Sequence, residues 1–499
     1  MFLAISFIFF TLFCCYFVYL HKRIHYHFEK NDLKYLPGVP VFGNILLSTL
    51  GRRHNVEDMD AVYKAFPGER YVGYIEGTKP VILIRDPELM KRITIKDFEY
   101  FADRKEFFPV EIAPLLGNSM INTNGYKWRE MRLNLSASFT GSKMRQMFPS
   151  MVDVSENIVS YLKSCQATPV DMVDTMRRYA NDTMASAFFG IQVNSVENRN
   201  NEFYKTGKDA ADFTVLDKVC YFLAVQSRLL AKVMQILGIQ IFSMKQINFF
   251  RDIIANNIKL RKQNNISRPD FIHHLLDLPG DWNPDDITGQ AFFAFLAGYE
   301  TSSSILAICI HELALNPDIQ ERLYQEIRAS ADVHKELNYD TLASLKYLDC
   351  YLNEINRKWA AAIVMDRICT RTYELPPPRE GGKPYKVMPG QLVYNVVNPV
   401  HMDPKYHVNP EVLDPDRFSD ENRPNIKQFT FLPFGMGPRR CLGLQFATMQ
   451  MKLILYQMVL NFEIQKCEMT TDPIRMYPSV LIIKSIGGTW VRIRHRLRT

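Results

Sequence analysis

One cysteine in a glycine-rich loop constrains this chain more than any other feature. Cys441 stands in the run Phe434-Gly435-Met436-Gly437-Pro438-Arg439-Arg440-Cys441-Leu442-Gly443, directly before a helical pattern. A thiol at a helix N-terminus is helped to ionise, and glycines let the backbone approach a flat ligand closely. A lone cysteine elsewhere is usually a small buried apolar residue. The loop therefore predicts a thiolate that binds a ligand, with a helix directly behind it.

Two further motifs place side chains on one helix face. Glu354 and Arg357 are three residues apart and can pair, although most such pairs are solvated surface contacts. Trp128 and Arg132 are four residues apart and also share a face. The alternative for this second pair is an ordinary amphipathic helix with one core tryptophan.

A third motif interrupts an apolar helix. The run Ala297-Gly298-Tyr299-Glu300-Thr301-Ser302 puts an acid and hydroxyls where they are costly unless paired or functional. Thr301 could simply bond back to a carbonyl and bend the helix. Gly298 could permit a local widening of the helix.

Composition and charge exclude several classes. The 499 residues carry a net charge of +7, too modest for a nucleic-acid binder. Nine scattered cysteines without a Cys-x-x-Cys pair do not fit a disulfide scaffold or a zinc ribbon. Most of the chain is therefore expected in a reducing compartment.

The amino terminus reads as a membrane anchor. Residues 1–20 lack charge and are long enough to span a bilayer as a helix, and Lys22 and Arg23 follow at once. We expect a single uncleaved transmembrane helix with the rest of the chain on the cytosolic side, the alternative being a removed signal peptide. Residues 21–43 read as a basic stretch and a Pro/Gly hinge. Residues 44–499 then form one domain.

The remaining pattern predicts a mainly α fold with a small β part. A hairpin is expected over residues 71–85, and mainly helices from 86 to 351. The longest helix should begin at Asn283-Pro284, end at Asn316-Pro317, and be buried because its centre is apolar on nearly every face. Short strands are expected over 373–400, and a final hairpin-like stretch over 478–491.

Taken together, these motifs resemble the cytochrome P-450 superfamily, whose signature Phe-x-x-Gly-x-Arg-x-Cys-x-Gly the loop around Cys441 matches. Two stretches, 84–98 and 139–148, look similar to insect microsomal members linked to foreign-compound metabolism. The resemblance covers the whole chain and implies that fold together with a haem b cofactor.

The resemblance also implies roles for individual residues. Cys441 would be the thiolate ligand of the haem iron, within a loop formed by Phe434, Gly435 and Gly443. Glu354, Arg357 and Arg417 would brace that loop. Trp128, Arg132, Arg367 and Arg439 would hold the haem propionates. Thr301 would take part in oxygen activation, with Glu300 helping to deliver protons.

The implied reaction inserts one atom of O₂ into a lipophilic substrate, a foreign compound such as a plant toxin or insecticide, or an endogenous lipid. No dinucleotide-binding fingerprint is present. Electrons would come from NADPH through a flavoprotein reductase, with cytochrome b5 as a further partner, at the endoplasmic reticulum membrane. The candidates for a basic docking face are Lys127, Arg129, Arg439 and Arg440, the alternative being an ordinary solvated charged face. A haem-thiolate isomerase or dehydratase, and a haem-binding membrane protein without turnover, are the alternatives.

Several apolar positions are candidates for the substrate pocket. They are Phe107, Phe108, Phe213, Phe293, Ala297, Ala362, Ile363, Val364 and Leu481. The chain departs from the family at Ala360-Ala361, where Pro-Pro is common. Losing prolines relaxes the backbone of a loop that usually lines the pocket, which bears on substrate preference rather than on haem binding.

Overall fold

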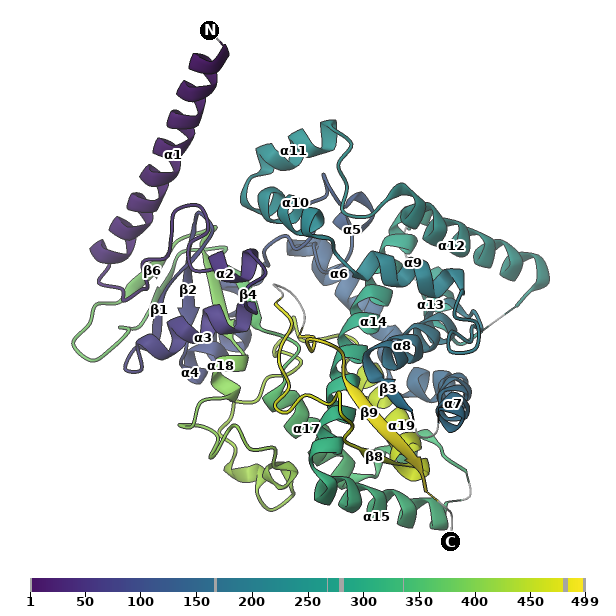
Figure 1. Cartoon of the computed structure of the whole chain (residues 1–499). Coiled ribbons are helices and arrows are strands. Elements are labelled where there is room, and N and C mark those ends of the chain that lie inside the picture. The colour runs from purple at the N-terminus through teal and green to yellow at the C-terminus, as the bar shows by residue number, and fades with distance from the viewer. Residues whose placement is uncertain are drawn as a thin grey trace.

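The structure is a computed structural model that describes residues 2–165, 168–266, 268–277, 282–334, 336–478 and 483–496. Helices form most of the body, the largest sheet lies to one side, and a three-stranded sheet lies among the helices (Figure 1). The prediction of a mainly α fold with a small β part is confirmed.

The helices and strands have the following bounds. The helices are α1 (Phe2–Lys30), α2 (Leu46–Thr49), α3 (Asn55–Ala65), α4 (Pro87–Lys91), α5 (Pro114–Gly117), α6 (Gly125–Ser136), α7 (Gly141–Ser164), α8 (Met172–Phe189), α9 (Glu202–Ala211), α10 (Val215–Gln226), α11 (Arg228–Ile236), α12 (Met244–Asn264), α13 (Phe271–Leu276), α14 (Pro284–Leu315), α15 (Pro317–Val333), α16 (Tyr339–Ala343), α17 (Lys346–Lys358), α18 (Asn398–His401) and α19 (Leu444–Asn461). The strands are β1 (Tyr71–Glu76), β2 (Lys79–Ile84), β3 (Pro169–Asp171), β4 (Val364–Ile368), β5 (Tyr373–Leu375), β6 (Tyr385–Val387), β7 (Leu392–Val396), β8 (Phe462–Gln465) and β9 (Trp490–His495).

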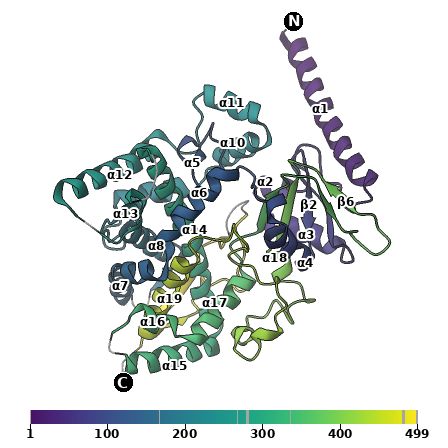
Figure 2. The same cartoon turned by 180° about the vertical axis from the view of Figure 1, so that it is seen from behind.

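The largest sheet joins strands from distant parts of the sequence. Its order is β1-β2-β7-β4. Strands β1 and β2 form the predicted hairpin, which turns at Gly77 with a positive φ of 62°. Strand β2 then pairs in parallel with β7, Val81 opposite Leu392. Seen from behind, this sheet lies on the same side of the molecule as α1, away from the helical body (Figure 2).

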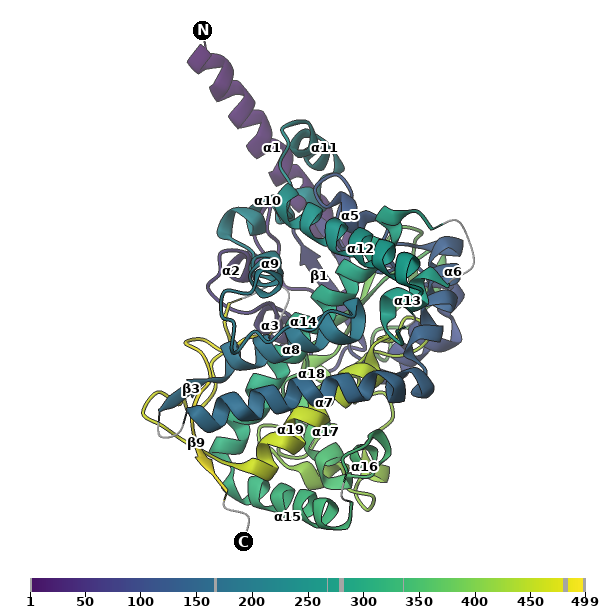
Figure 3. The same cartoon turned by 90° about the vertical axis from the view of Figure 1, so that its right-hand side faces the viewer.

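Helix α14 forms the centre of the helical body. It begins where predicted, because the Asn283 side chain accepts a hydrogen bond from the Asp286 N–H at 2.8 Å and Pro284 fills the first turn. Helices α8, α12 and α19 pack against it, and α7 packs on α8 and α19 (Figure 3). Within the described ranges, α14 is the helix long and apolar enough to cross a membrane, but most of its apolar stretch is buried in the protein. It is therefore a core helix.

The two ends of the chain differ from the predictions in detail. Helix α1 continues through the basic stretch to Lys30, so the predicted hinge at 21–43 is irregular only in its second part. The expected hairpin-like stretch at 478–491 is confirmed in part: Met476 and Ser485 form an antiparallel bridge, which begins slightly before the predicted range, whereas β9 begins at Trp490 and pairs with β3 and β8. Pairing partners this far apart in sequence leave no local pattern.

Candidate functional site

The Cys441 loop is held by its own backbone. The Cys441 N–H donates to the Phe434 carbonyl at 2.8 Å, and the Gly435 N–H donates to the Leu432 carbonyl at 3.0 Å. Gly437 has a φ of 71°, and a Cβ there would overlap the Thr94 carbonyl oxygen. The close turn delivers Cys441 to the start of α19, which is capped at Gly443.

The Cys441 sulfur faces a cavity of about 390 Å³. The side chain is accessible from that cavity, although protein encloses it on its other sides. This enclosure raises the pKa of the thiol, whereas a backbone hydrogen bond from Gly443 and the charge of Arg132 act to lower it. The Gly443 hydrogen bond and the Arg132 charge are the kinds of contact that stabilise a thiolate.

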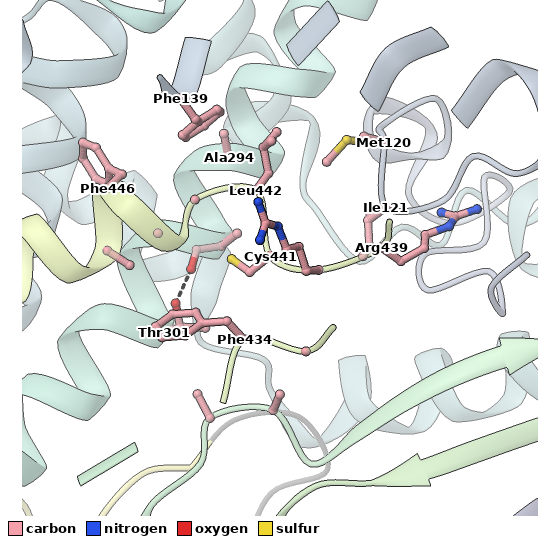
Figure 4. Close-up of a pocket in the computed structure, with 18 of the residues that line it drawn as sticks. Met120, Ile121, Phe139, Ala294, Thr301, Phe434, Arg439, Cys441, Leu442 and Phe446 are labelled. Atoms are coloured by element: carbon pink, nitrogen blue, oxygen red, sulfur yellow. Dashed lines mark hydrogen bonds between the residues drawn. The ribbon is translucent and has the colours of Figure 1, made fainter. Parts of the chain in front are cut away.

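The middle of α14 lies on the same cavity. Figure 4 shows the Thr301 hydroxyl and the Cys441 sulfur at the cavity, with Phe434 beside them. Thr301 Oγ1 donates back to the Ala297 carbonyl, the local bond expected for a helical threonine. The helix is continuous through Gly298, without the local widening that its sequence suggested. Gly298 instead makes room for α8, since a Cβ there would lie 2.7 Å from Met184 Sδ.

Glu300 points elsewhere. It is 2% exposed and is not among the residues that line the cavity. Its carboxylate accepts hydrogen bonds from Arg177 at 3.0 and 3.2 Å and forms an ion pair with Lys484. Asp212 pairs with Arg177 at 2.7 Å and with Lys484 at 3.4 Å. Two cations thus neutralise two acids in one cluster, in which Glu300 is buried and Asp212 is exposed.

Glu354 and Arg357 form a fully buried pair on α17. Arg357 donates two hydrogen bonds to the Glu354 carboxylate, at 2.8 and 2.7 Å, and both side chains are 0% exposed. Arg357 also donates to the carbonyls of His401 at 3.0 Å and Pro410 at 2.7 Å, while Arg417 donates to Glu354 at 3.2 Å. The structure therefore brings these three predicted residues together.

His401 links this cluster to the segment before the cysteine loop. Its Nδ1–H donates to the Arg357 carbonyl at 3.2 Å, and its Nε2 accepts from the Leu432 N–H at 2.7 Å. Burial lowers the pKa of His401 to about 3, and the charges of His407 and Arg357 act in the same direction. The ring is therefore neutral at physiological pH.

Four of the arginines that line the cavity have few acidic partners. Arg104 pairs with Asp366 at 2.9 Å. Arg367 is 2% exposed, and its Nε has no hydrogen-bond partner among the described residues. Burial, reinforced by Arg104, lowers the pKa of Arg367 to about 10, and burial also lowers that of Arg132. This wall of the cavity is short of negative charge.

The fourth arginine, Arg439, stacks on Trp128 of α6. Its guanidinium carbon lies 3.8 Å from the ring centroid, a cation–π contact. It donates to the carbonyls of Ala102 at 2.9 Å and Thr123 at 3.2 Å, and to Asn124 Oδ1 at 3.0 Å. Those three bonds leave two of its five N–H groups for another partner.

Sequence reasoning located only part of the cavity lining. Phe293, Ala297, Ala362 and Val364 line it. Phe107 and Phe213 line two separate cavities, while Phe108 and Ile363 are buried in the core. Leu481 lies outside the described residues.

An aromatic wall escaped sequence reasoning. Phe139, Phe188, Phe271 and Phe446 line the cavity and contact one another in edge-on and tilted pairs. Phe446 could have been found, because it lies in the first turn of α19, directly after the Cys441 loop. Phe188 and Phe271 carry no such signal, since core phenylalanines have the same pattern.

A cysteine on a backbone-held loop, facing a buried core helix across a cavity rich in arginine, defines the haem-thiolate class of enzyme. A family model described as Cytochrome P450 matches residues 34–490. The chain therefore belongs to the cytochrome P450 family, and it is a haem-thiolate monooxygenase.

Named relatives match over nearly their whole length. Cytochrome P450 9e2 of Blattella germanica is 35% identical, over 95% of this chain and 94% of the relative. Probable cytochrome P450 9f2 of Drosophila melanogaster is 34% identical, over 94% and 95%. Cytochrome P450 6k1 of Blattella germanica is 30% identical, over 96% and 94%. The prediction of a resemblance to insect members is confirmed.

Proposed function

We propose that Cys441 binds the iron of haem b and that the cavity oxidises lipophilic substrates, which are foreign compounds or endogenous lipids. The observation that carries this proposal is the unpartnered Arg367 Nε, buried in a cavity wall that is short of negative charge among the described residues. Haem b carries two propionates, which would satisfy that donor and offset the excess positive charge. The residues present therefore fit the group.

Each residue has a part in holding the cofactor. Cys441 would supply the thiolate, and Arg132, Arg367, Arg439 and Trp128 would hold the propionate side. Haem bound through a thiolate supplies O–O cleavage, because the ligand pushes electron density onto the iron.

The loop itself is braced from behind. Glu354 accepts hydrogen bonds from Arg357, Arg417 and the Asp414 N–H, so one carboxylate fixes the segment that leads toward the cysteine. Buried ion pairs are favourable only when their remaining donors and acceptors are satisfied, as they are here. The brace keeps Cys441 in place rather than taking part in chemistry.

Thr301 would manage protons at the cavity. Its hydroxyl hydrogen goes to the Ala297 carbonyl, which leaves the oxygen lone pairs free to accept a hydrogen bond from water. Ordered water at this point controls where a proton is delivered. Thr301 at the cavity favours a monooxygenase over an isomerase or dehydratase. Glu300 would act through the Arg177 and Lys484 cluster, because its carboxylate is held there.

The proposed location is the endoplasmic reticulum membrane, with residues 1–20 spanning it and the single domain 44–499 in the cytosol. Helices α1 and α11 lie at the same end of the molecule (Figures 1 and 3). Exposed apolar side chains gather on α11 and the start of α10: Val215, Leu216, Leu229, Val233 and Ile236. Such a face suits the bilayer interface.

An NADPH-dependent flavoprotein reductase would supply electrons, with cytochrome b5 as a further donor. Of the basic candidates for docking, Arg129 pairs with Glu99 at 2.6 Å, Lys127 donates to Asn118 at 3.1 Å, and Arg440 is exposed beside Cys441. Arg440 also lines the cavity, and no ion pair of its side chain is found among the described residues. Arg440→Glu should weaken reductase binding, and more so at low salt.

The central test is a spectrum. Reduced protein with carbon monoxide should show the red-shifted Soret band of thiolate-ligated haem, and Cys441→Ser should abolish it. Cys467→Ser, in a loop remote from the cavity lining, is the matched control and should keep the band. A histidine-type band in the wild type would refute the proposal. NADPH consumption with purified reductase and a panel of lipophilic compounds then tests turnover.

A further inference from the structure

Glu312 is a buried carboxylate to which the proposed chemistry gives no role. It lies on α14, about three turns beyond Thr301, and is 3% exposed. Its Oε1 accepts a hydrogen bond from the Trp359 indole N–H at 2.7 Å and another from Lys358 Nζ at 3.1 Å. The lysine balances the charge of the acid, so the buried group is paired as well as hydrogen-bonded.

Trp359 lies where the core helix α14, the C-terminal segment and a cavity-lining loop meet. It follows the last residue of α17 and precedes the segment that carries Ala361, Ala362 and Val364 into the cavity wall. Its ring packs against a small apolar cluster formed by α14 and the C-terminal segment: Ile308, Ile474, Ile483 and Met476. One side chain therefore touches the core helix, the C-terminal segment and the start of a cavity-lining loop.

Among the described residues, backbone hydrogen bonds hold that loop only at its two ends. The Trp359 N–H closes α17 on the Ile355 carbonyl at 2.8 Å, and the Val397 N–H bonds the Ile363 carbonyl at 3.1 Å. Between them, no hydrogen bond of Ala360, Ala361 or Ala362 is found within the described part of the chain. Alanines here also leave the backbone freer than prolines would. Ala360 and Ile363 pack in the core, so this packing and the contacts at the start of the loop together set its course.

We propose that the Glu312–Trp359 hydrogen bond is the positioning contact that fixes residues 360–364 and thereby sets which large ligands the cavity admits. The inference rests on the proposed haem site, whose substrate side this loop lines. Glu312 and Trp359 are positioning residues, because neither lines the cavity. Prolines in place of Ala360-Ala361 would restrain the backbone of this loop, and the indole hydrogen bond of Trp359 is another way to hold it.

The test uses the full-length holoenzyme and two probes that bind haem iron, imidazole and the bulkier 4-phenylimidazole. Trp359→Phe keeps the ring and removes only the N–H donor. It should change the ratio of the two dissociation constants by about fivefold or more, the scale of one buried hydrogen bond. Glu312→Ala removes the acceptor and should change the same ratio, so the test survives if one variant fails to fold.

Three further variants make the test specific. Glu312→Gln keeps an oxygen acceptor and should leave the ratio near that of the wild type. Trp490→Phe, which removes an indole bond to the Gly487 carbonyl at 2.9 Å, is the matched control and should have no effect. Adding Ala361→Pro to Trp359→Phe should restore the wild-type ratio.

The outcomes separate the two proposals. If the wild type lacks the red-shifted Soret band with carbon monoxide, the proposed function fails and this inference fails with it. If every variant keeps the band but Trp359→Phe and Glu312→Ala leave the ratio unchanged, only the inference is overturned. An equal change in Trp490→Phe would also overturn it.

Discussion

His401→Gln should reverse the order of stability of the variant and the wild type as the pH falls. In the wild type, Nε2 accepts from the Leu432 N–H at 2.7 Å and Nδ1–H donates to the Arg357 carbonyl at 3.2 Å. Those partners admit one neutral tautomer. A proton on Nε2 would place two donors face to face in a buried site.

The magnitude follows from the pKa. Burial lowers the pKa of His401 to about 3, whereas the unfolded value is 6.5. A histidine with a depressed folded pKa contributes stability above pH 6.5 and loses it as the unfolded chain takes up a proton. As the pH falls from about 7.5 to about 5, this one residue should therefore lower the free energy of unfolding of the wild type by about 2 kcal/mol.

The substituted glutamine side chain would keep an acceptor for the Leu432 N–H and lose the bond to the Arg357 carbonyl, worth about 1 kcal/mol at any pH. The variant should thus be about 1 kcal/mol less stable than the wild type at about pH 7.5 and about 1 kcal/mol more stable at about pH 5.

Urea unfolding of the detergent-solubilised holoenzyme, followed by tryptophan fluorescence at both pH values, measures the difference. The exposed residue His334 offers a matched control, His334→Gln, which should change the stability by less than about 0.5 kcal/mol. A stability difference for His401→Gln that is the same at both pH values would refute the reasoning, because the wild-type ring would then titrate alike in both states.

Three other predictions concern the brace, the cofactor and the membrane. Glu354→Gln leaves the buried Arg357 without a counter-charge, so it should lower the free energy of unfolding by about 3–5 kcal/mol and release much of the bound haem. Urea unfolding and haem content measure the two effects, and unchanged stability would contradict the prediction. Arg367→Gln should speed haem transfer to apomyoglobin about tenfold or more by removing a charged donor, while the red-shifted Soret band stays; an unchanged rate argues against a propionate contact. In a chain lacking residues 1–20, replacing exposed apolar residues of α11 by serine should weaken the free energy of vesicle binding by about 1.5 kcal/mol or more per side chain. Co-sedimentation with vesicles measures this, and replacing exposed polar residues by serine should have no such effect. The substituted positions on α11 are Leu229, Val233 and Ile236.

Local chemistry made part of the fold predictable. The Asn283 cap and Pro284 mark the start of α14, and Gly77 marks the turn between β1 and β2, because each acts on its immediate neighbours. The parallel pairing of β2 with β7 could not be predicted, since strand partners separated by most of the helical body share no sequence signal.

The same limit applies to the site. Cys441 and Thr301 could be placed at the cavity, because short motifs with a chemical reason surround them. The ion pairs of Glu300 with Arg177 and Lys484 could not, because they join three distant segments. Spacing along a helix determines which face of the helix a side chain occupies, but not which residues of other segments face it.

The pairing of β2 with β7 also imposes an order on biosynthesis. Val81 pairs with Leu392, so the ribosome must add about 310 residues, about 15–60 s at the usual rate, before the sheet can close. During that interval the β1–β2 hairpin is a marginal structure with an unpaired apolar edge at residues 81–84. A nascent chain stalled before β7 should therefore bind holding chaperones through this edge, and release them once β7 has emerged.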